Sequence, residues 1–216
     1  MKVILNTNST MLVIWTLLLL TGLISLGLAR WSLAFVSLAT LTLALVPPML
    51  AARWSLTLPL PFLLFTTLFC FASIFLGEAF DFYERLWWWD LALHGSSAVG
   101  FGLMGFLFAF MLFEGDRFAA PPSAIALISF CVAMTVGATW EIFEFTMDTG
   151  LGMDMQKSGL SDTMGDLILN AFGGLIASVT GYLYLRQSSA GLLGRGLSQF
   201  INVNGRLYRK YKNRSK

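Results

Sequence analysis

Three short segments of the sequence place ionisable and polar side chains three or four residues apart, which is the spacing of one helix face. One imidazole with several carboxylates can hold Zn²⁺, Mn²⁺ or Fe²⁺, or can move protons as a general acid and base. A proton relay and a salt bridge suit the same residues equally well. The residues are Asp90 and His94 in the first segment, Glu141, Glu144 and Asp148 in the second, and Asp162, Asp166 and Asn170 in the third.

The expected role of each group depends on the helix end at which it lies. The three aspartates near predicted helix N-termini interact favourably with the helix dipole, so each alone is typical of a cap. Glu141 and Glu144 lie near a predicted C-terminus, where negative charge needs a cation, a basic group or protonation by burial. His94 is the only histidine. We therefore expect His94, Glu141 and Glu144 to be the ligands of a divalent metal ion, and these three with Asp166 to be the catalytic candidates.

A short polar loop, residues 149–161, connects the second and third segments. Its glycines would let it fold back over the polar groups as a lid. Lys157 in this loop could bind an anionic headgroup, although most loop lysines are simply exposed to solvent. The residues that we expect to bind substrate or to complete the site are Asp90, Asp148, Gln156, Lys157, Asp162 and Asn170.

The elements that carry these residues are predicted from composition. Of the 216 residues, 12% are charged and 56% are hydrophobic, whereas soluble domains carry about 25% charged residues. This composition excludes a soluble enzyme, and a net charge of +2 gives no basic excess that would indicate nucleic-acid binding. Cys70 and Cys131 lie inside apolar runs and indicate neither a disulfide framework nor a thiolate metal site.

Six apolar runs are long enough, or nearly so, to cross a bilayer as helices. Backbone groups of lone strands would lack partners in lipid, and no alternating pattern of a barrel is present. We predict an all-α integral membrane protein with about six transmembrane helices, the first a retained helix rather than a cleaved signal peptide. The runs are Met11–Leu28, Ser32–Ala52, Phe62–Gly77, Leu91–Phe113, Ala124–Phe145 and Met164–Leu185.

Lysine and arginine predict the orientation, because they concentrate on the cytoplasmic side of membrane proteins. With six spans, 11 of the 14 basic residues fall on the side of both termini, which is therefore predicted to be cytoplasmic. Ten of the 12 acidic residues fall on the opposite side. The basic residues on the predicted cytoplasmic side are Lys2, Arg53, Arg117, Arg186, Arg195, Arg206, Arg209, Lys210, Lys212, Arg214 and Lys216.

The predicted organisation has three parts: a helical hairpin over 1–60, a core over 61–185 with a polar pocket between the fourth, fifth and sixth spans, and a basic cytoplasmic tail over 186–216. The tail between Leu192 and Tyr211 has near-helical apolar spacing, which indicates a helix at the surface of anionic inner-leaflet lipid. The polar groups are compatible with three functions. These are an enzyme or ligand-binding protein acting on lipid or a lipid-linked envelope precursor, a small proton- or ion-coupled transporter, and a structural or assembly factor.

Four motifs also carry a family resemblance over about residues 76–185. Together they resemble the YjdF-like family of uncharacterised bacterial inner-membrane proteins and, more distantly, the VanZ-like pattern. The resemblance implies a multi-pass inner-membrane protein and matches Asp90, His94, Glu141 or Glu144, Gln156, Asp166, Asn170 and Gly173 position by position. It differs from the VanZ-like pattern at Lys157-Ser158-Gly159, where an arginine is usual. The motifs are Trp89-Asp-Leu-Ala-Leu-His94, Trp140-Glu-Ile-Phe-Glu144, Gln156-Lys-Ser-Gly159 and Asp162-Thr-Met-Gly-Asp166-Leu-Ile-Leu-Asn170.

Overall fold

The computed structural model describes residues 8–113, 116, 119–187 and 191–209. Six helices of this part of the chain are long and apolar enough to cross a membrane, which confirms the predicted all-helical membrane fold. The helices are α1 (Ser9–Gly27), α2 (Trp31–Arg53), α3 (Leu60–Cys70) with its π-helical continuation η2 (Phe71–Leu76) and α4 (Gly77–Ala79), α5 (Phe82–Arg85), α6 (Trp89–Leu112), α7 (Pro122–Leu151), α8 (Leu160–Gln187) and α9 (Gly191–Val203). Six of the basic residues used for orientation, Lys2, Arg117, Lys210, Lys212, Arg214 and Lys216, lie outside the described residues.

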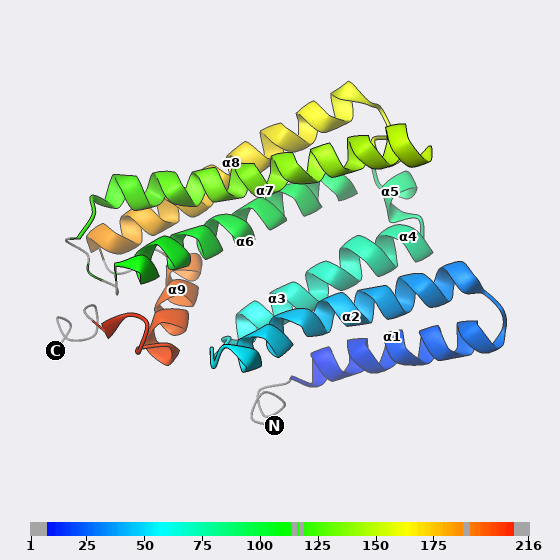
Figure 1. The fold of residues 1–216 in the computed structure, drawn as a ribbon, viewed down its shortest axis with the longest axis horizontal. Coiled ribbons are helices and arrows are strands. Elements are labelled where there is room, and N and C mark those ends of the chain that lie inside the picture. Colours follow the sequence, from blue (N-terminus) through cyan, green and yellow to red (C-terminus); the bar gives the residue numbers. More distant parts are fainter. Residues whose placement is uncertain (1–7, 114–115, 117–118, 188–190, 210–216) are drawn as a thin grey trace. The chain divides into compact units, whose positions relative to one another are not determined.

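The chain divides into two compact units, Met1–Trp89 and Asp90–Lys216. In the first unit, α1 and α2 form an antiparallel hairpin (Figure 1) around a core that includes Leu18 and Phe75. The proline pair Pro47-Pro48 lies inside α2 and does not end it. The predicted boundary at residue 60, which separates the first two spans from the other four, stays a prediction.

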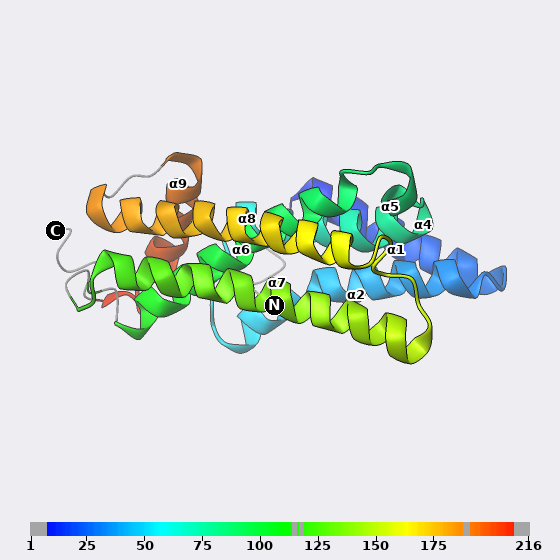
Figure 2. The same cartoon turned by 90° about the horizontal axis from the view of Figure 1, so that it is seen from above.

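The second unit is built on α6, α7 and α8, with α7 and α8 side by side in two perpendicular views (Figures 1 and 2). Small residues allow the close approach of these helices, as is usual in membranes. A Cβ added to Gly173 of α8 would lie 2.5 Å from the carbonyl oxygen of Gly95 and 2.8 Å from the Cβ of Ala98, both on α6. Further along the pair, a Cβ on Gly102 would meet the Cβ of Ala177.

Helices α7 and α8 extend beyond their apolar runs. Helix α7 continues six residues past Phe145, and Gly152, whose φ of 66° is left-handed, follows its end. The amide of Gly152 donates to the carbonyl of Asp148, so the glycine closes the helix as C-terminal glycines commonly do. Because the helix continues through this polar stretch, the second group of acidic residues lies on a single rigid helix.

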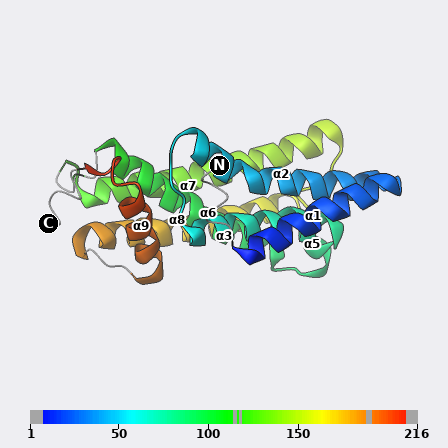
Figure 3. The same ribbon diagram turned by 90° about the horizontal axis from the view of Figure 1, so that it is seen from below.

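Helix α9 crosses the bundle at the end where α8 finishes (Figures 1 and 3). Leu197 and Ile201 of α9 are buried in one cluster with Phe106 and Phe110 of α6. In the structure protein covers Leu197 and Ile201, while Leu192 and Val203 at the two ends of α9 are exposed. The predicted contact of this helix with lipid stays a prediction beside this protein contact. An amphipathic pattern alone cannot distinguish these two coverings.

Candidate metal centre

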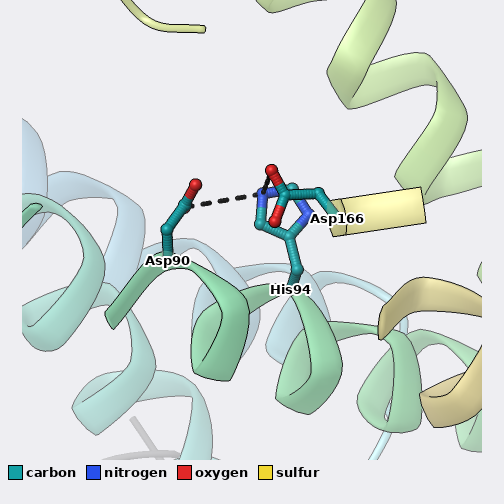
Figure 4. Close-up of side chains that lie close together, drawn as sticks. All are labelled: Asp90, His94 and Asp166. Carbon is teal, nitrogen blue, oxygen red and sulfur yellow. Dashed lines mark ion pairs between the residues drawn. The ribbon is translucent and has the colours of Figure 1, made fainter. Parts of the chain in front are cut away.

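His94 is the centre of the polar cluster of the second unit. It is buried on the inner face of α6, one turn after Asp90. Its Nε2 lies 3.6 Å from Oδ1 of Asp90 and 4.0 Å from Oδ2 of Asp166, which comes from α8 (Figure 4). Its other ring nitrogen, Nδ1, lies 3.6 Å from Oε1 of Glu141 on α7. The histidine therefore meets carboxylates from all three helices.

Asp90, His94 and Asp166 are close enough to share one cation, because one ligand atom from each lies within 4.8 Å of the others. Ligand atoms bound to one divalent ion at about 2.0–2.2 Å are about 3.0–3.5 Å apart. The distances of 3.6 and 4.0 Å thus need only a small contraction. An imidazole with two carboxylates fits Mn²⁺, Fe²⁺ or Zn²⁺.

Asn170 completes the cluster on the Nδ1 side of the imidazole. Its Nδ2 lies 3.5 Å from Nδ1 of His94, and the residue is fully buried one turn after Asp166 on α8. Space for it comes from Gly137 of α7, where any Cβ would collide with the Asn170 side chain. Sequence inspection missed Gly137, because its role appears only once α7 and α8 are packed.

Several buried polar atoms of the cluster have no hydrogen-bond partner among the described residues. These are both carboxylate oxygens of Asp166 and Oδ1 of Asn170. The Glu141 carboxylate has no close partner either, but it interacts with the side chain of Thr163. Asp166 is 1% exposed and Glu141 is 4% exposed. A buried polar group without a partner costs about 1–3 kcal/mol, and more when it is charged. The arrangement is therefore costly to the protein alone and is suited to a ligand that the oxygens can bind.

Glu144 lies one turn beyond Glu141 on α7 and is also buried. Its Oε1 accepts a hydrogen bond of 2.9 Å from Nε1 of Trp140, a partner that the sequence analysis did not single out although the four-residue spacing would have revealed it. On the opposite face of the same stretch, Ile142 and Phe145 are 65% and 57% exposed. Large apolar side chains on the outer face indicate that the cluster lies at a depth where α7 is surrounded by lipid.

The family described as "Predicted membrane protein (DUF2238)" matches residues 9–187. The chain belongs to this family. The matched range includes all six membrane-spanning helices up to Gln187 and every residue of the polar cluster. A Thermotoga maritima protein described as "Uncharacterized protein" is 34% identical over 112 residues, which are 50% of this chain and 57% of that protein. No solved structure matches the chain.

Within this DUF2238 family member, the loop between α7 and α8 is held by Asp148. Its two carboxylate oxygens accept 2.8 Å hydrogen bonds from the backbone amides of Met155 and Gln156. The side-chain amide of Gln156 donates to Oγ1 of Thr163 on α8. Asp148 thus shapes the loop, and Gln156 connects it to Thr163, whose side chain also interacts with Glu141. The binding roles predicted for Asp148 and Gln156 stay predictions.

Lys157 and Asp162 lie at the rim of the cluster. Lys157 is exposed, and it interacts electrostatically with both Asp90 and Asp162. The predicted metal ligands were His94, Glu141 and Glu144, whereas the group within reach of one ion is Asp90, His94 and Asp166. The two sets differ because the two aspartates lie on the Nε2 side of the imidazole, and Glu141 lies on the Nδ1 side. The catalytic and ligand roles of the glutamates stay predictions.

Proposed function

We propose that this chain is a membrane-embedded metalloprotein that binds a divalent cation at Asp90, His94 and Asp166 and acts there on a lipid or a lipid-linked envelope substrate. The observation that carries the proposal is a largely buried ligand group from α6 and α8 in which neither oxygen of Asp166 has a hydrogen-bond partner among the described residues. A bound cation would offset the cost of that carboxylate and would polarise an oxygen of the substrate as a Lewis acid.

The other residues of the cluster support this role by their positions. Neither oxygen of Asp166 has a hydrogen-bond partner among the described residues, and Oδ2 lies 4.0 Å from Nε2 of His94, so Asp166 is the best-placed anionic ligand. Glu144, buried beside the ion and held by Trp140, is the proposed general base. With Nε2 on the metal, Nδ1 carries the ring proton, so Asn170 would orient the imidazole by turning its amide to place the acceptor Oδ1 at Nδ1 in place of Nδ2. Lys157 at the rim offers a positive charge to an anionic headgroup.

The proposed location of the site is the outer leaflet of the bacterial inner membrane. The polar cluster lies near the start of α8, whereas Arg186 lies in its last turn and Arg195 and Arg206 follow it. Because basic residues favour the cytoplasmic side, we expect the cluster to face outward. A reporter enzyme that works only in the cytoplasm should then be active when fused after Lys216. A fusion that is active only outside the cytoplasm would overturn this orientation.

The alternative of an ion-coupled transporter has less support, because the buried helix faces below the cluster carry few polar side chains. A conduction path needs polar groups that continue across the membrane. Between Asn170 and Tyr184, the buried residues of α8 are Gly173, Gly174, Ala177 and Gly181. The facing part of α6 is similarly small or aromatic, from Ala98 to Phe106. Among the described residues, this stretch offers no ionisable side chain to relay a proton.

Metal analysis of the purified full-length protein in detergent tests the proposal. Wild-type protein dialysed against Mn²⁺ and freed of excess metal should retain bound ion, and Asp166→Asn should lose it. Asp154→Asn is the matched control, because Asp154 is an exposed carboxylate of the α7–α8 loop and should leave binding unchanged. Wild-type protein without stoichiometric metal would contradict the proposal.

The substrate class needs a second measurement. Metal-loaded wild-type protein is incubated with a bacterial membrane lipid extract, and the lipids are compared by mass spectrometry with those left by Asp166→Asn. A lipid or lipid-linked species consumed or retained only by the wild type supports the proposal. Identical extracts, with nothing bound to either protein, would overturn the lipid substrate while leaving the metal site intact.

A further inference from the structure

A groove lies in the first unit beside the turn that joins α1 to α2 (Figure 1). It is formed by Leu26 in the last turn of α1 and by one face of the first half of α2, from Trp31 to Thr42. A Cβ on Gly22 would lie 2.7 Å from Cδ2 of Leu38, so the two helices are in close contact beside the groove. The groove has a volume of about 520 Å³, and pockets that bind small molecules usually measure about 300–1,000 Å³. Nearly all of its lining is apolar, so it suits an apolar ligand.

The shape of the groove comes from a contrast between large and small side chains on α2. Trp31 and Phe35 project from the helix and are 68% and 74% exposed, whereas Ala34 is 1% exposed. The small side chains of Ala34 and Ala39 leave room beside the two aromatic rings. The groove is therefore open at the protein surface and has an aromatic side chain at hand to flank a long apolar ligand.

The bilayer can supply such a ligand. Helices α1 and α2 are both long and apolar enough to cross a membrane, so the groove opens toward acyl chains. An acyl chain that enters it exchanges one apolar environment for another, because lipid tails are as apolar as leucine side chains. Apolar contacts therefore determine which shape fits, and a preference for one lipid over its neighbours needs a polar group at the end of the groove.

Arg30 provides that polar group. It directly precedes Trp31 and is exposed, and its side chain makes no ion pair with any residue that the structure describes. The turn fixes its backbone, because its amide donates to the carbonyl of Ser25 at 2.9 Å and Ala29 has a left-handed φ of 56°. A guanidinium binds phosphate oxygens through two parallel hydrogen bonds. A lipid with net negative charge is favoured over a zwitterionic one, whose own cation cancels part of the attraction.

We propose that the first unit binds one anionic phospholipid, with an acyl chain in the groove and the headgroup phosphate at Arg30. The rings of Trp31 and Phe35 flank the chain, and the space beside Ala34 and Ala39 holds it. This site lies within the first unit alone and does not depend on the metal centre of the second unit. Either proposal can therefore fail without the other.

Quenching of Trp31 fluorescence by brominated lipid measures this binding, because bromine on an acyl chain quenches a tryptophan that it touches. Full-length protein is reconstituted in phosphatidylcholine vesicles with a small fraction of brominated phosphatidylglycerol, and brominated phosphatidylcholine gives the reference for random mixing. Each protein is measured with and without Trp31→Phe, which isolates Trp31 among the seven tryptophans. We expect brominated phosphatidylglycerol at Trp31 about tenfold above random mixing, because a hydrogen bond to a charged group contributes about 1.5–3 kcal/mol.

Two variants should remove this preference, Arg30→Gln by loss of the guanidinium and Ala39→Leu by filling the groove. Matched substitutions near the other end of α2, Arg53→Gln and Ala52→Leu, change exposed residues and should retain it. Random mixing in the wild type would overturn the inference even if no variant were recovered. A preference that survives Arg30→Gln would show that the arginine does not bind the headgroup, and one that survives Ala39→Leu would show that the chain lies outside the groove. Either result would overturn the proposed site.

Discussion

Buried polar groups at the two ends of the α6–α8 bundle differ in whether they have hydrogen-bond partners. Toward the α9 end, Ser129 donates to the carbonyl of Gly102 at 2.7 Å, and Ser178 donates to the carbonyl of Ala126 at 2.8 Å. The hydroxyl of Tyr208 likewise donates to the carbonyl of Leu107 at 3.0 Å. At the other end, the oxygens of Asp166 have no hydrogen-bond partner among the described residues, and Oδ2 lies 4.0 Å from Nε2 of His94.

This difference separates a structural role from a functional one. A polar cluster that serves only to connect helices lowers the free energy when its groups are paired, as they are toward the α9 end. Unpaired carboxylates raise the free energy of the protein alone and persist where a ligand completes them. The α9 end therefore has paired polar groups, whereas the His94 end has a group of side chains that could hold a metal ion.

The largest expected effect is the stabilisation of the His94 end by metal. Mn²⁺ at 100 times its dissociation constant should raise the free energy of unfolding by about 2.7 kcal/mol, because the ion binds only the folded protein. Thermal unfolding in detergent, with and without a chelator, measures this difference. His94→Ala should abolish it, whereas Tyr208→Phe at the other end should retain it. An equal response of His94→Ala and wild type would contradict the assignment.

The second prediction compares two glycines of α8 that allow close packing at the two ends. A Cβ on Gly173 would collide with the backbone carbonyl of Gly95, which cannot move alone, whereas the atoms nearest a Cβ on Gly181 belong to the ring of Phe106. We expect Gly173→Ala to destabilise the protein by about 2–3 kcal/mol and to weaken Mn²⁺ binding. Gly181→Ala should be milder and should leave Mn²⁺ affinity unchanged. Equal Mn²⁺ affinities in the two variants would show that helix spacing at Gly173 does not position the ligands.

The third prediction concerns the metal-free protein, in which the two ends should respond to mutation with opposite sign. Asp166→Asn removes a buried, unpaired carboxylate, so in the presence of a chelator it should stabilise the protein by about 1–2 kcal/mol. In the presence of Mn²⁺ the same variant should be less stable than wild type, because it has lost a ligand. Thermal unfolding in both conditions gives the two signs. Destabilisation of the metal-free protein would instead place Asp166 among the structural groups.

Features of the fold that depend on neighbouring residues in the chain could be predicted from the sequence, and features that depend on how the helices pack could not. The six spans were predictable because each is an apolar run, and the shared face of Asp90 and His94 was predictable from their spacing. The pairing of His94 Nε2 with Asp166 was not, because it depends on how α8 is rotated against α6. That rotation is set by Gly173, whose role as a contact with the Gly95 backbone is visible only in three dimensions. The extension of α7 past Phe145 was missed because apolar character ends there while the helix continues.

The smallest expected effect is at the α9 end, where Tyr208→Phe removes one buried hydrogen bond. We expect a loss of about 1 kcal/mol near neutral pH, measured by thermal unfolding. Burial raises the pKa of the Tyr208 phenol above its ordinary value. Above about pH 10 the unfolded chain would therefore release this proton while the folded protein retains it, so wild-type stability should fall as pH rises. Tyr208→Phe should fall less steeply, and parallel curves would show that the phenol is ionised equally in both states.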